Sequence, residues 1–172
     1  MNGQPFILWL DDPAAVRNPA LGGKFSSLAQ SAAAGLPVPQ GFGVTTHAYR
    51  HFMREAGLEA EARRVRAACA GLSAELISSE TAGLVRSIVT APMPPAIEES
   101  VREAYAGLER RTGKTSVPVA VRSSGESEDL AGASFAGQYE TFLWVTGADA
   151  VISHMRRCWA VMFADTVLSY RP

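Results

Sequence analysis

Short apolar runs, each ended by a turn, occur near the two ends of this chain and not in its middle. Residues 5–10 and 41–44 are the first two runs, and residues 117–121 and 141–145 are the last two. Runs of this length bounded by Gly, Pro or Asp are typical of strands. Residues 59–108, in contrast, have a helical character. The pattern predicts an α+β fold with most of its strands near the ends.

The expected helices are marked by spacing and by their first and last residues. One follows Lys24 and stops at Gly35, because its apolar residues recur three and four positions apart. Thr45 or Thr46 is expected to cap a second, which carries Phe52. Further helices are expected to end at residue 70, to run from about 79 to 89, to begin at residues 94–95 and to begin at about 148.

Length and composition exclude several classes of protein. The chain has 172 residues, which suits a single domain. Its net charge of −1 gives no general attraction for nucleic acids or anionic membranes. Hydrophobic residues make up 47%, which excludes a disordered chain. Two cysteines are too few for a disulfide scaffold, and no apolar run is long enough to span a bilayer, so we expect a cytoplasmic protein.

A first candidate site is the turn Gly22-Gly23-Lys24, which opens the first expected helix. Glycines allow the backbone to approach an anion, and a helix N-terminus offers N–H groups to it. The turn lacks the full spacing of a P-loop. A phosphate-binding turn and a plain tight turn with a solvated lysine therefore both fit this segment.

A second candidate site follows the strand at residues 119–121. Arg122-Ser123-Ser124 comes directly after it, and residues 133–138 form a run of small residues that ends in Gly137-Gln138. An arginine fork beside bare backbone amides suits a polyphosphate. An ordinary polar connection explains the serines and glycines but not an arginine so close to an apolar run.

These segments, taken in order, resemble the N-terminal nucleotide-binding domain of phosphoenolpyruvate synthase and pyruvate phosphate dikinase. Rifampin phosphotransferase and phenylphosphate synthase use a similar domain. The resemblance skips the helical middle of the chain. The matching blocks are residues 21–28, 35–42, 45–49, 119–124, 128–130, 133–138 and 140–143.

The resemblance implies the N-terminal lobe of an ATP-grasp fold, with a helical insert at about residues 57–110. Lys24 and Arg122 would contact the phosphates of ATP, and the loop at residues 134–138 would close over them. The residues so assigned to the nucleotide are Gly22, Gly23, Lys24, Arg122, Ser134, Ala136, Gly137, Gln138 and Thr141, with Arg122 as the catalytic residue and none assigned to a metal.

The family's chemistry implies ATP and Mg²⁺ as cofactors. In that family the β-phosphate of ATP passes to a carrier histidine and then to a small acceptor such as pyruvate, and the resemblance implies the same here. The second ATP-grasp lobe, the phosphohistidine domain and the substrate domain have no counterpart in residues 1–172, so we expect the chain alone to be inactive and its partner to be the segment or subunit that carries them. The alternative is a stand-alone, non-catalytic module that binds a nucleotide or a partner protein.

The sequence departs from the family pattern at Gly125-Glu126-Ser127, which adds a carboxylate beside the expected phosphate site.

Several other residues could suggest a site by their spacing or their chemistry, but we interpret them as ordinary structural residues. His47, His51 and Glu55 recur every four residues, and we interpret them as a polar helix face. We expect His154 and the basic run Arg63, Arg64 and Arg66 on the surface, and Trp144, Trp159, Phe163 and Tyr170 in the core.

Overall fold

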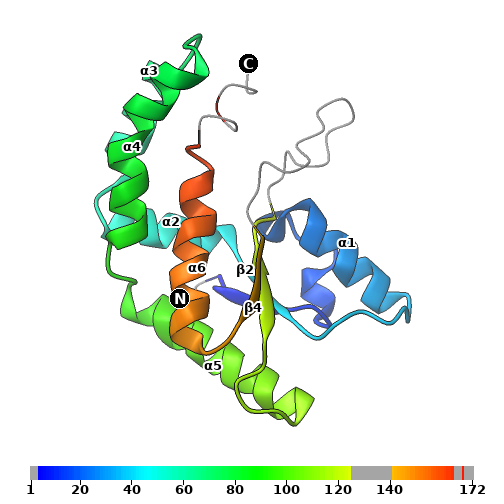
Figure 1. The fold of residues 1–172 in the computed structure, drawn as a ribbon. Helices are drawn as coiled ribbons and strands as arrows, with labels where there is room; N and C mark the ends of the chain where they lie inside the picture. The colour runs from blue at the N-terminus through cyan, green and yellow to red at the C-terminus, as the bar shows by residue number, and fades with distance from the viewer. Residues whose placement is uncertain (1–3, 125–140, 165–167, 169–172) are drawn as a thin grey trace.

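The computed structural model describes residues 4–124, 141–164 and 168 of the chain. In Figure 1, α1 lies to the right of the strands, and α3, α4 and α6 lie to the left. The described elements combine helices with two small antiparallel sheets, as the α+β prediction requires. The elements are β1 (Ile7–Trp9), the short 3₁₀ helices Pro13–Ala15 and Pro19–Leu21, α1 (Gly22–Ala33), β2 (Phe42–Val44), α2 (Thr46–Glu55), α3 (Glu59–Ala68), α4 (Ala74–Thr90), α5 (Pro95–Thr112), β3 (Val119–Arg122), β4 (Thr141–Val145) and α6 (Ala148–Val161).

The first sheet pairs β1 with β2, with Ile7 opposite Val44 and Trp9 opposite Phe42. Helix α1 packs on this sheet. A Cβ built on Gly43 of β2 would lie 2.7 Å from a Leu21 methyl carbon, so the sheet and the start of α1 are in close contact. A small core lies beneath them. It consists of Leu8, Ala15, Leu21 and Ala29.

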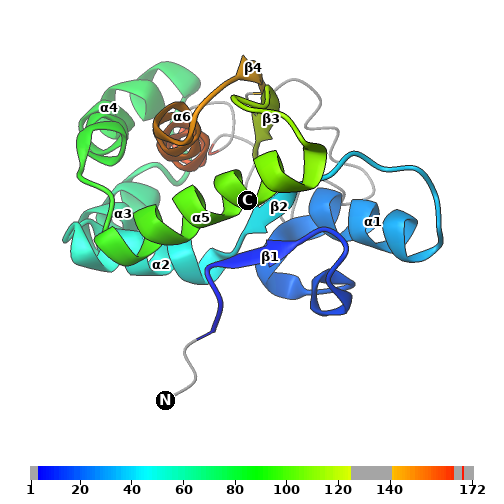
Figure 2. The ribbon, with the colours of Figure 1, turned by 90° about the horizontal axis from the view of Figure 1, so that it is seen from below.

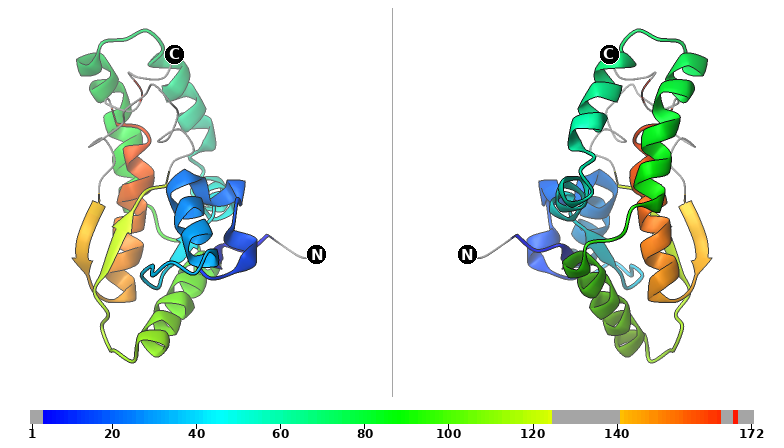
Figure 3. Two further views of the ribbon diagram at one scale, coloured as in Figure 1. Left: turned by 90° about the vertical axis from the view of Figure 1, so that its right-hand side faces the viewer. Right: turned by 90° about the vertical axis from the view of Figure 1, so that its left-hand side faces the viewer.

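The second sheet pairs β3 with β4, and it packs on α6 (Figure 3). Val119 and Val121 of β3 are half-buried, whereas Ala120 and Arg122 are exposed. The strand is therefore covered on one face only in the described structure. Arg122 is the last residue of the strand rather than the first residue after it.

The helical middle contains α3, α4 and α5, as its composition predicted. Helix α4 begins at Ala74, five positions before the expected start at residue 79. Helix α5 runs across the underside of the molecule (Figure 2) and ends at Gly113, whose φ of 68° is the left-handed conformation that glycine adopts without strain. The three helices share the main core with α2 and α6. Its fully buried members include Phe52, Val65, Leu84, Ile88, Ile97, Val101 and Phe163.

The expected cap of α2 is only partly correct. Thr45 is the N-cap residue, but its side chain makes no capping hydrogen bond. Its hydroxyl instead donates to the Pro5 carbonyl oxygen at 2.8 Å. Thr45 is only 2% exposed, so this hydroxyl needs an acceptor inside the protein, and the bond ties α2 to the segment before β1.

Within residues 4–124, 141–164 and 168, no helix has both the length and the apolar character that crossing a membrane requires.

Candidate functional site

The two candidate segments of the sequence meet at the N-terminal end of α1. The backbone N–H of Phe25, in the first part of this helix, donates to the Ser124 hydroxyl oxygen at 3.0 Å. The two residues are 99 positions apart. This hydrogen bond places the end of β3 directly against the glycine turn.

Gly22 makes this close approach possible. A Cβ built on Gly22 would lie 1.8 Å from the Ser124 carbonyl oxygen and 2.6 Å from its carbonyl carbon. Gly22 also has φ 71° and ψ 168°, a backbone conformation that essentially only glycine adopts. Both its missing side chain and its backbone freedom are therefore used at the junction of α1 and β3.

Arg122 and Thr141 face each other across the second sheet. They are a register pair of β3 and β4, so their side chains project from the same face. Both residues are exposed. Ser124, which contacts α1, lies two residues beyond Arg122, and the exposed end of this sheet therefore adjoins the glycine turn.

Tyr105 of α5 holds this sheet in place from behind. Its hydroxyl donates to the Val117 carbonyl oxygen and accepts from the Gly147 backbone N–H, both at 2.8 Å. Tyr105 is only 4% exposed. One buried hydroxyl thus fixes the segment that enters β3 and the segment that leaves β4.

Helix α6 supports the inner face of β4. The Phe142 ring lies 4.5 Å from the His154 ring, centroid to centroid, and the Arg157 guanidinium carbon lies 4.5 Å from the Phe142 centroid. His154 Nδ1 is 2.7 Å from the Ala150 carbonyl oxygen. The expectation of a surface histidine is therefore wrong, because His154 is half-buried between α6 and the sheet.

The structure brings together some of the predicted site residues and leaves others undescribed. Gly22, Gly23 and Lys24 form the first turn of α1, and the last two are partly exposed there. Arg122 and Thr141 are paired at the neighbouring end of the sheet. The remaining predicted residues lie outside the described part of the chain. These are Ser134, Ala136, Gly137 and Gln138, as well as the unusual carboxylate Glu126.

Sequence reasoning missed two residues that assemble the site, Ser124 and Tyr105. Ser124 belonged to the motif, but nothing in the local pattern indicated its contact with α1. Tyr105 lies on the buried face of α5, and nothing in the sequence around it indicated its two hydrogen bonds to the segments around the sheet.

The histidine pair lies on α2, where His51 contacts an arginine and an aromatic ring. His51 Nδ1 lies 2.6 Å from a terminal nitrogen of Arg54, and its ring lies 5.3 Å from that of Phe6. No group of three or more His, Cys, Asp or Glu side chains could hold a metal ion among the residues that the structure describes. These contacts support the interpretation of a polar helix face.

The aromatic residues expected in the core have different positions. Phe163 is fully buried, and Trp159 packs against the rings of Tyr49 and Phe52 at 5.7 and 5.0 Å between centroids. Trp144, in contrast, is 80% exposed, so its prediction as a core residue is wrong. A bulge in β4 turns it outward. Tyr170 lies outside the described residues.

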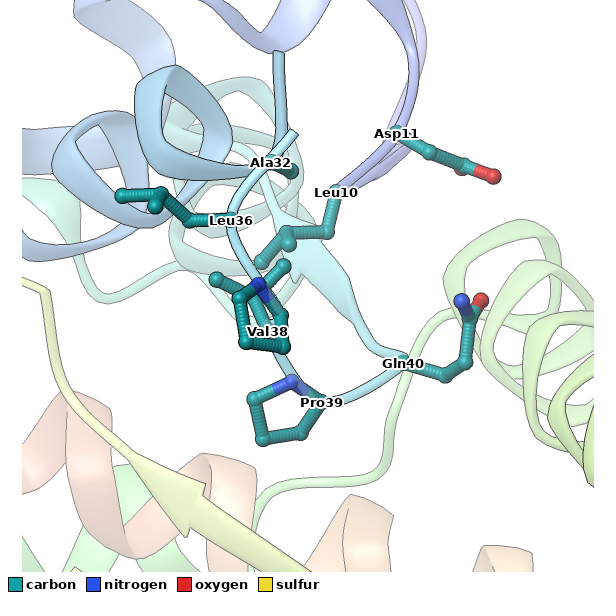
Figure 4. A pocket seen from close by; sticks show the side chains of 8 residues that line it. Leu10, Asp11, Ala32, Leu36, Val38, Pro39 and Gln40 are labelled. Carbon is teal, nitrogen blue, oxygen red and sulfur yellow. The ribbon is translucent and has the colours of Figure 1, made fainter. Parts of the chain in front are cut away.

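A shallow hollow of about 250 Å³ lies at the other end of α1, and Figure 4 shows it between Ala32, Leu36 and the chain around Leu10. Helix α1 begins at Gly22, ten residues before Ala32, which corresponds to about 15 Å of helix. The hollow is therefore separate from the junction at Ser124. It is lined by the Asp11 carboxylate and several apolar side chains and by no cationic side chain of the described residues, so it does not suit a polyphosphate.

Burial raises the pKa of two side chains away from the junction, Cys69 and Tyr49. Burial raises the pKa of the Cys69 thiol above its ordinary value, with a smaller raising effect from Glu80. Burial also raises the pKa of Tyr49, and nearby Arg66 opposes this. Both cysteines are buried. Neither perturbed group lies on the exposed end of the second sheet.

Comparison with known proteins places this geometry in a family. The family described as "Pyruvate phosphate dikinase, AMP/ATP-binding domain" matches residues 18–172, which include both the glycine turn and the second sheet. The chain belongs to this family. The resemblance noted from the sequence motifs is thereby confirmed, and the helical middle is part of the match.

Relatives of this dikinase-type nucleotide-binding domain cover nearly the whole chain. The chain is 38% identical to a probable phosphoenolpyruvate synthase of Staphylothermus marinus and 39% identical to the phosphoenolpyruvate synthase of Aeropyrum pernix. It is 37% identical to a probable phosphoenolpyruvate synthase of Methanocaldococcus jannaschii. Each match covers 96% of this chain but only 20%, 20% and 14%, respectively, of the relative's length. These matches favour an enzyme's nucleotide-binding lobe over a stand-alone module.

Proposed function

We propose that the chain is the first lobe of an ATP-grasp fold and binds ATP where α1 meets the β3–β4 sheet. The observation that carries the proposal is the contact between Gly22 and Ser124, because it places the Lys24 turn beside the strand that ends in Arg122. Two cations from distant segments serve a polyphosphate only where those segments meet.

The chemistry of the junction suits phosphate groups. The N-terminal turn of a helix directs backbone N–H groups and partial positive charge outward. Lys24 adds a point charge and Arg122 a planar fork of donors. Thr141, opposite Arg122, adds a hydroxyl on the same exposed face. We assign Gly22, Gly23, Lys24, Arg122 and Thr141 to the nucleotide, together with Ser134, Ala136, Gly137 and Gln138, which lie outside the described residues.

For the whole protein we propose a dikinase-type phosphotransfer similar to that of phosphoenolpyruvate synthase. The β-phosphate of ATP would pass to a carrier histidine and then to a small acceptor such as pyruvate. Lys24 and Arg122 would hold the phosphates and offset the negative charge that shifts during transfer, with Arg122 as the catalytic residue. The carrier histidine and the acceptor site would belong to the protein's other segments, and the whole would act in the cytoplasm.

In this proposal Mg²⁺ is only the ion that accompanies ATP. The described residues contain no cluster of carboxylates that could hold a metal ion. We therefore assign Mg²⁺ no ligand among the described residues.

Calorimetric titration with Mg²⁺-ATP tests the site in the 172-residue chain. One lobe of a two-lobed site leaves the phosphate contacts exposed to salt, so we expect a dissociation constant in the millimolar range. Arg122→Ala and Lys24→Ala should each weaken binding further, whereas Arg63→Ala, an exposed arginine on α3, should leave it unchanged. Equal effects of all three substitutions would refute the assignment.

In the full-length protein, Arg122→Ala should lower the rate of phosphoryl transfer by about 10²–10³-fold, because it removes a contact to the charge of the transition state. The far-ultraviolet circular dichroism spectrum should not change, since Arg122 is exposed. Near-normal turnover of the folded variant would show that Arg122 is not catalytic.

A further inference from the structure

The exposed face of the β3–β4 sheet carries two large apolar side chains beside the proposed phosphate contacts. Leu143 is 65% exposed and Trp144 is 80% exposed, and both follow Thr141 on β4. Phe142 and Val145 point the other way, toward the core. The apolar pair therefore belongs to the outer surface of the sheet.

The backbone at Trp144 is held in a conformation that tryptophan rarely adopts. Trp144 has φ 59°, in the left-handed region. The register explains the position: Val121 pairs with Phe142 and Val119 pairs with Val145, so β4 has one residue more than β3 in this interval. Such a bulge re-aims a side chain, and Asn or Gly would fit its left-handed residue with less strain than Trp. The fold therefore keeps the indole of Trp144 exposed to solvent, although the backbone conformation of this residue is strained.

The position of the bulge suits a nucleotide whose phosphates lie at Arg122. Thr141, the partner of Arg122, is three residues before Trp144, which corresponds to about 10 Å of strand. This length is comparable to the separation between the base and the terminal phosphates of an extended nucleoside triphosphate. Ala120, the residue of β3 that lies between the two register pairs, has only a methyl group and leaves the surface beside the bulge open to a flat ring.

We propose that Trp144, with Leu143 beside it, holds the base of the bound nucleotide by stacking, an inference that rests on the proposed ATP site. An aromatic side chain stacks on any base through its π-face, and a purine offers it more surface than a pyrimidine. The exposed face then has two parts. Arg122 and Thr141 bind the phosphates at one end, and Leu143 and Trp144 bind the base at the other.

The first test follows the three tryptophan indole N–H signals by nuclear magnetic resonance while the 172-residue chain is titrated with ATP, CTP or inorganic tripolyphosphate, each with Mg²⁺. The Trp144→Phe variant identifies the signal of Trp144. ATP should shift this signal most, CTP less and tripolyphosphate least, while the signals of Trp9 and Trp159 serve as internal controls. An unmoved Trp144 signal, at ATP concentrations that displace tripolyphosphate, would overturn the base contact and leave the phosphate site standing.

The second test compares two substitutions by calorimetry. Trp144→Asn should weaken ATP binding about tenfold and leave tripolyphosphate binding unchanged, whereas Trp144→Phe should keep most of the ATP affinity. Trp144→Asn should also melt at a higher temperature than the parent chain, because Asn tolerates the left-handed backbone. A lower melting temperature, or equal losses for ATP and tripolyphosphate, would overturn the inference.

The two proposals fail in different ways. If neither ATP nor tripolyphosphate binds at millimolar concentration, the phosphate site itself is refuted and the base contact with it. If both ligands bind and neither Trp144 substitution distinguishes them, only the base contact is refuted.

Discussion

The carbonyl oxygen of Ser124 occupies the space where a side chain of residue 22 would begin. The distance from that oxygen to a Cβ built on Gly22 is 1.8 Å, far inside any van der Waals contact. This carbonyl oxygen belongs to the backbone, which cannot rotate away from a new side chain as a flexible side chain can. The contact between α1 and β3 therefore requires a residue without a side chain at position 22.

Gly22→Ala should consequently separate the two segments or unfold the chain. The substitution combines a backbone conformation that essentially only glycine adopts, which costs about 1–3 kcal/mol for alanine, with a steric clash that costs about 1–3 kcal/mol. We expect a loss of about 2–6 kcal/mol in the free energy of unfolding, measured by urea denaturation.

Gly35→Ala is the matched control for this substitution. Gly35 has φ 77°, but a Cβ there would meet nothing within 4 Å. Only the backbone cost applies, and the loss should be about 1–2 kcal/mol. If the two variants were equally destabilised, the contact with Ser124 would not matter.

Ser124→Ala should weaken the same junction without a clash. It removes the acceptor of the Phe25 N–H, and a hydrogen bond of this kind contributes about 1 kcal/mol net. Ser31→Ala serves as the control, since Ser31 lies on α1 and its hydroxyl only donates back to the Ser27 carbonyl oxygen. Amide hydrogen exchange at Phe25 should become faster in the first variant alone. Unchanged protection there would contradict the bond.

Tyr105→Phe should loosen the support of the second sheet. The substitution leaves the Val117 carbonyl and the Gly147 N–H without their shared partner. We expect a loss of about 2 kcal/mol, which for a chain of this size lowers the melting temperature by roughly 4–8 °C. Differential scanning calorimetry measures the change. A variant as stable as the parent would show that other groups or water satisfy both segments.

Alkaline pH should destabilise the chain. Burial raises the pKa of Cys69 above the ordinary 9.0 and that of Tyr49 above the ordinary 10.0. Above these ordinary values the unfolded chain loses protons that the folded chain retains, so the unfolded state binds fewer protons and the free energy of unfolding falls as pH rises. The decline should begin near pH 9 in urea titrations and become shallower in Cys69→Ala. A flat profile between pH 8 and 10 would contradict the shift of Cys69, and a flat profile above pH 10 in Cys69→Ala would contradict that of Tyr49.

The burial of Cys69 has a second measurable consequence. The thiolate is the reactive form of cysteine, and a raised pKa keeps the thiol protonated at neutral pH. Cys69 and Cys158, both buried, should therefore react slowly with Ellman's reagent in the folded chain and rapidly in urea. Fast reaction of either thiol in native buffer would show that its surroundings open readily.

The sequence alone was enough to predict the α+β class, most of the elements and the family. Apolar spacing and turn residues act locally, so the helix that stops before Gly35 and the strand at residues 141–145 were found where expected. The motifs around Lys24 and Arg122 carried the resemblance that the comparison confirmed, because their residue types are those that phosphate chemistry requires.

Tertiary structure alone decided which segments meet and which faces stay open. No local pattern could pair Ser124 with Gly22 or place the Tyr105 hydroxyl between two distant backbone groups, because these contacts join residues that are far apart in the chain. Nor could a local pattern place Trp144, because simple alternation along β4 would put it on the inner face with Phe142, and the bulge turns it outward. The register of β3 and β4 creates that bulge, and register is a property of two paired strands rather than of either strand alone.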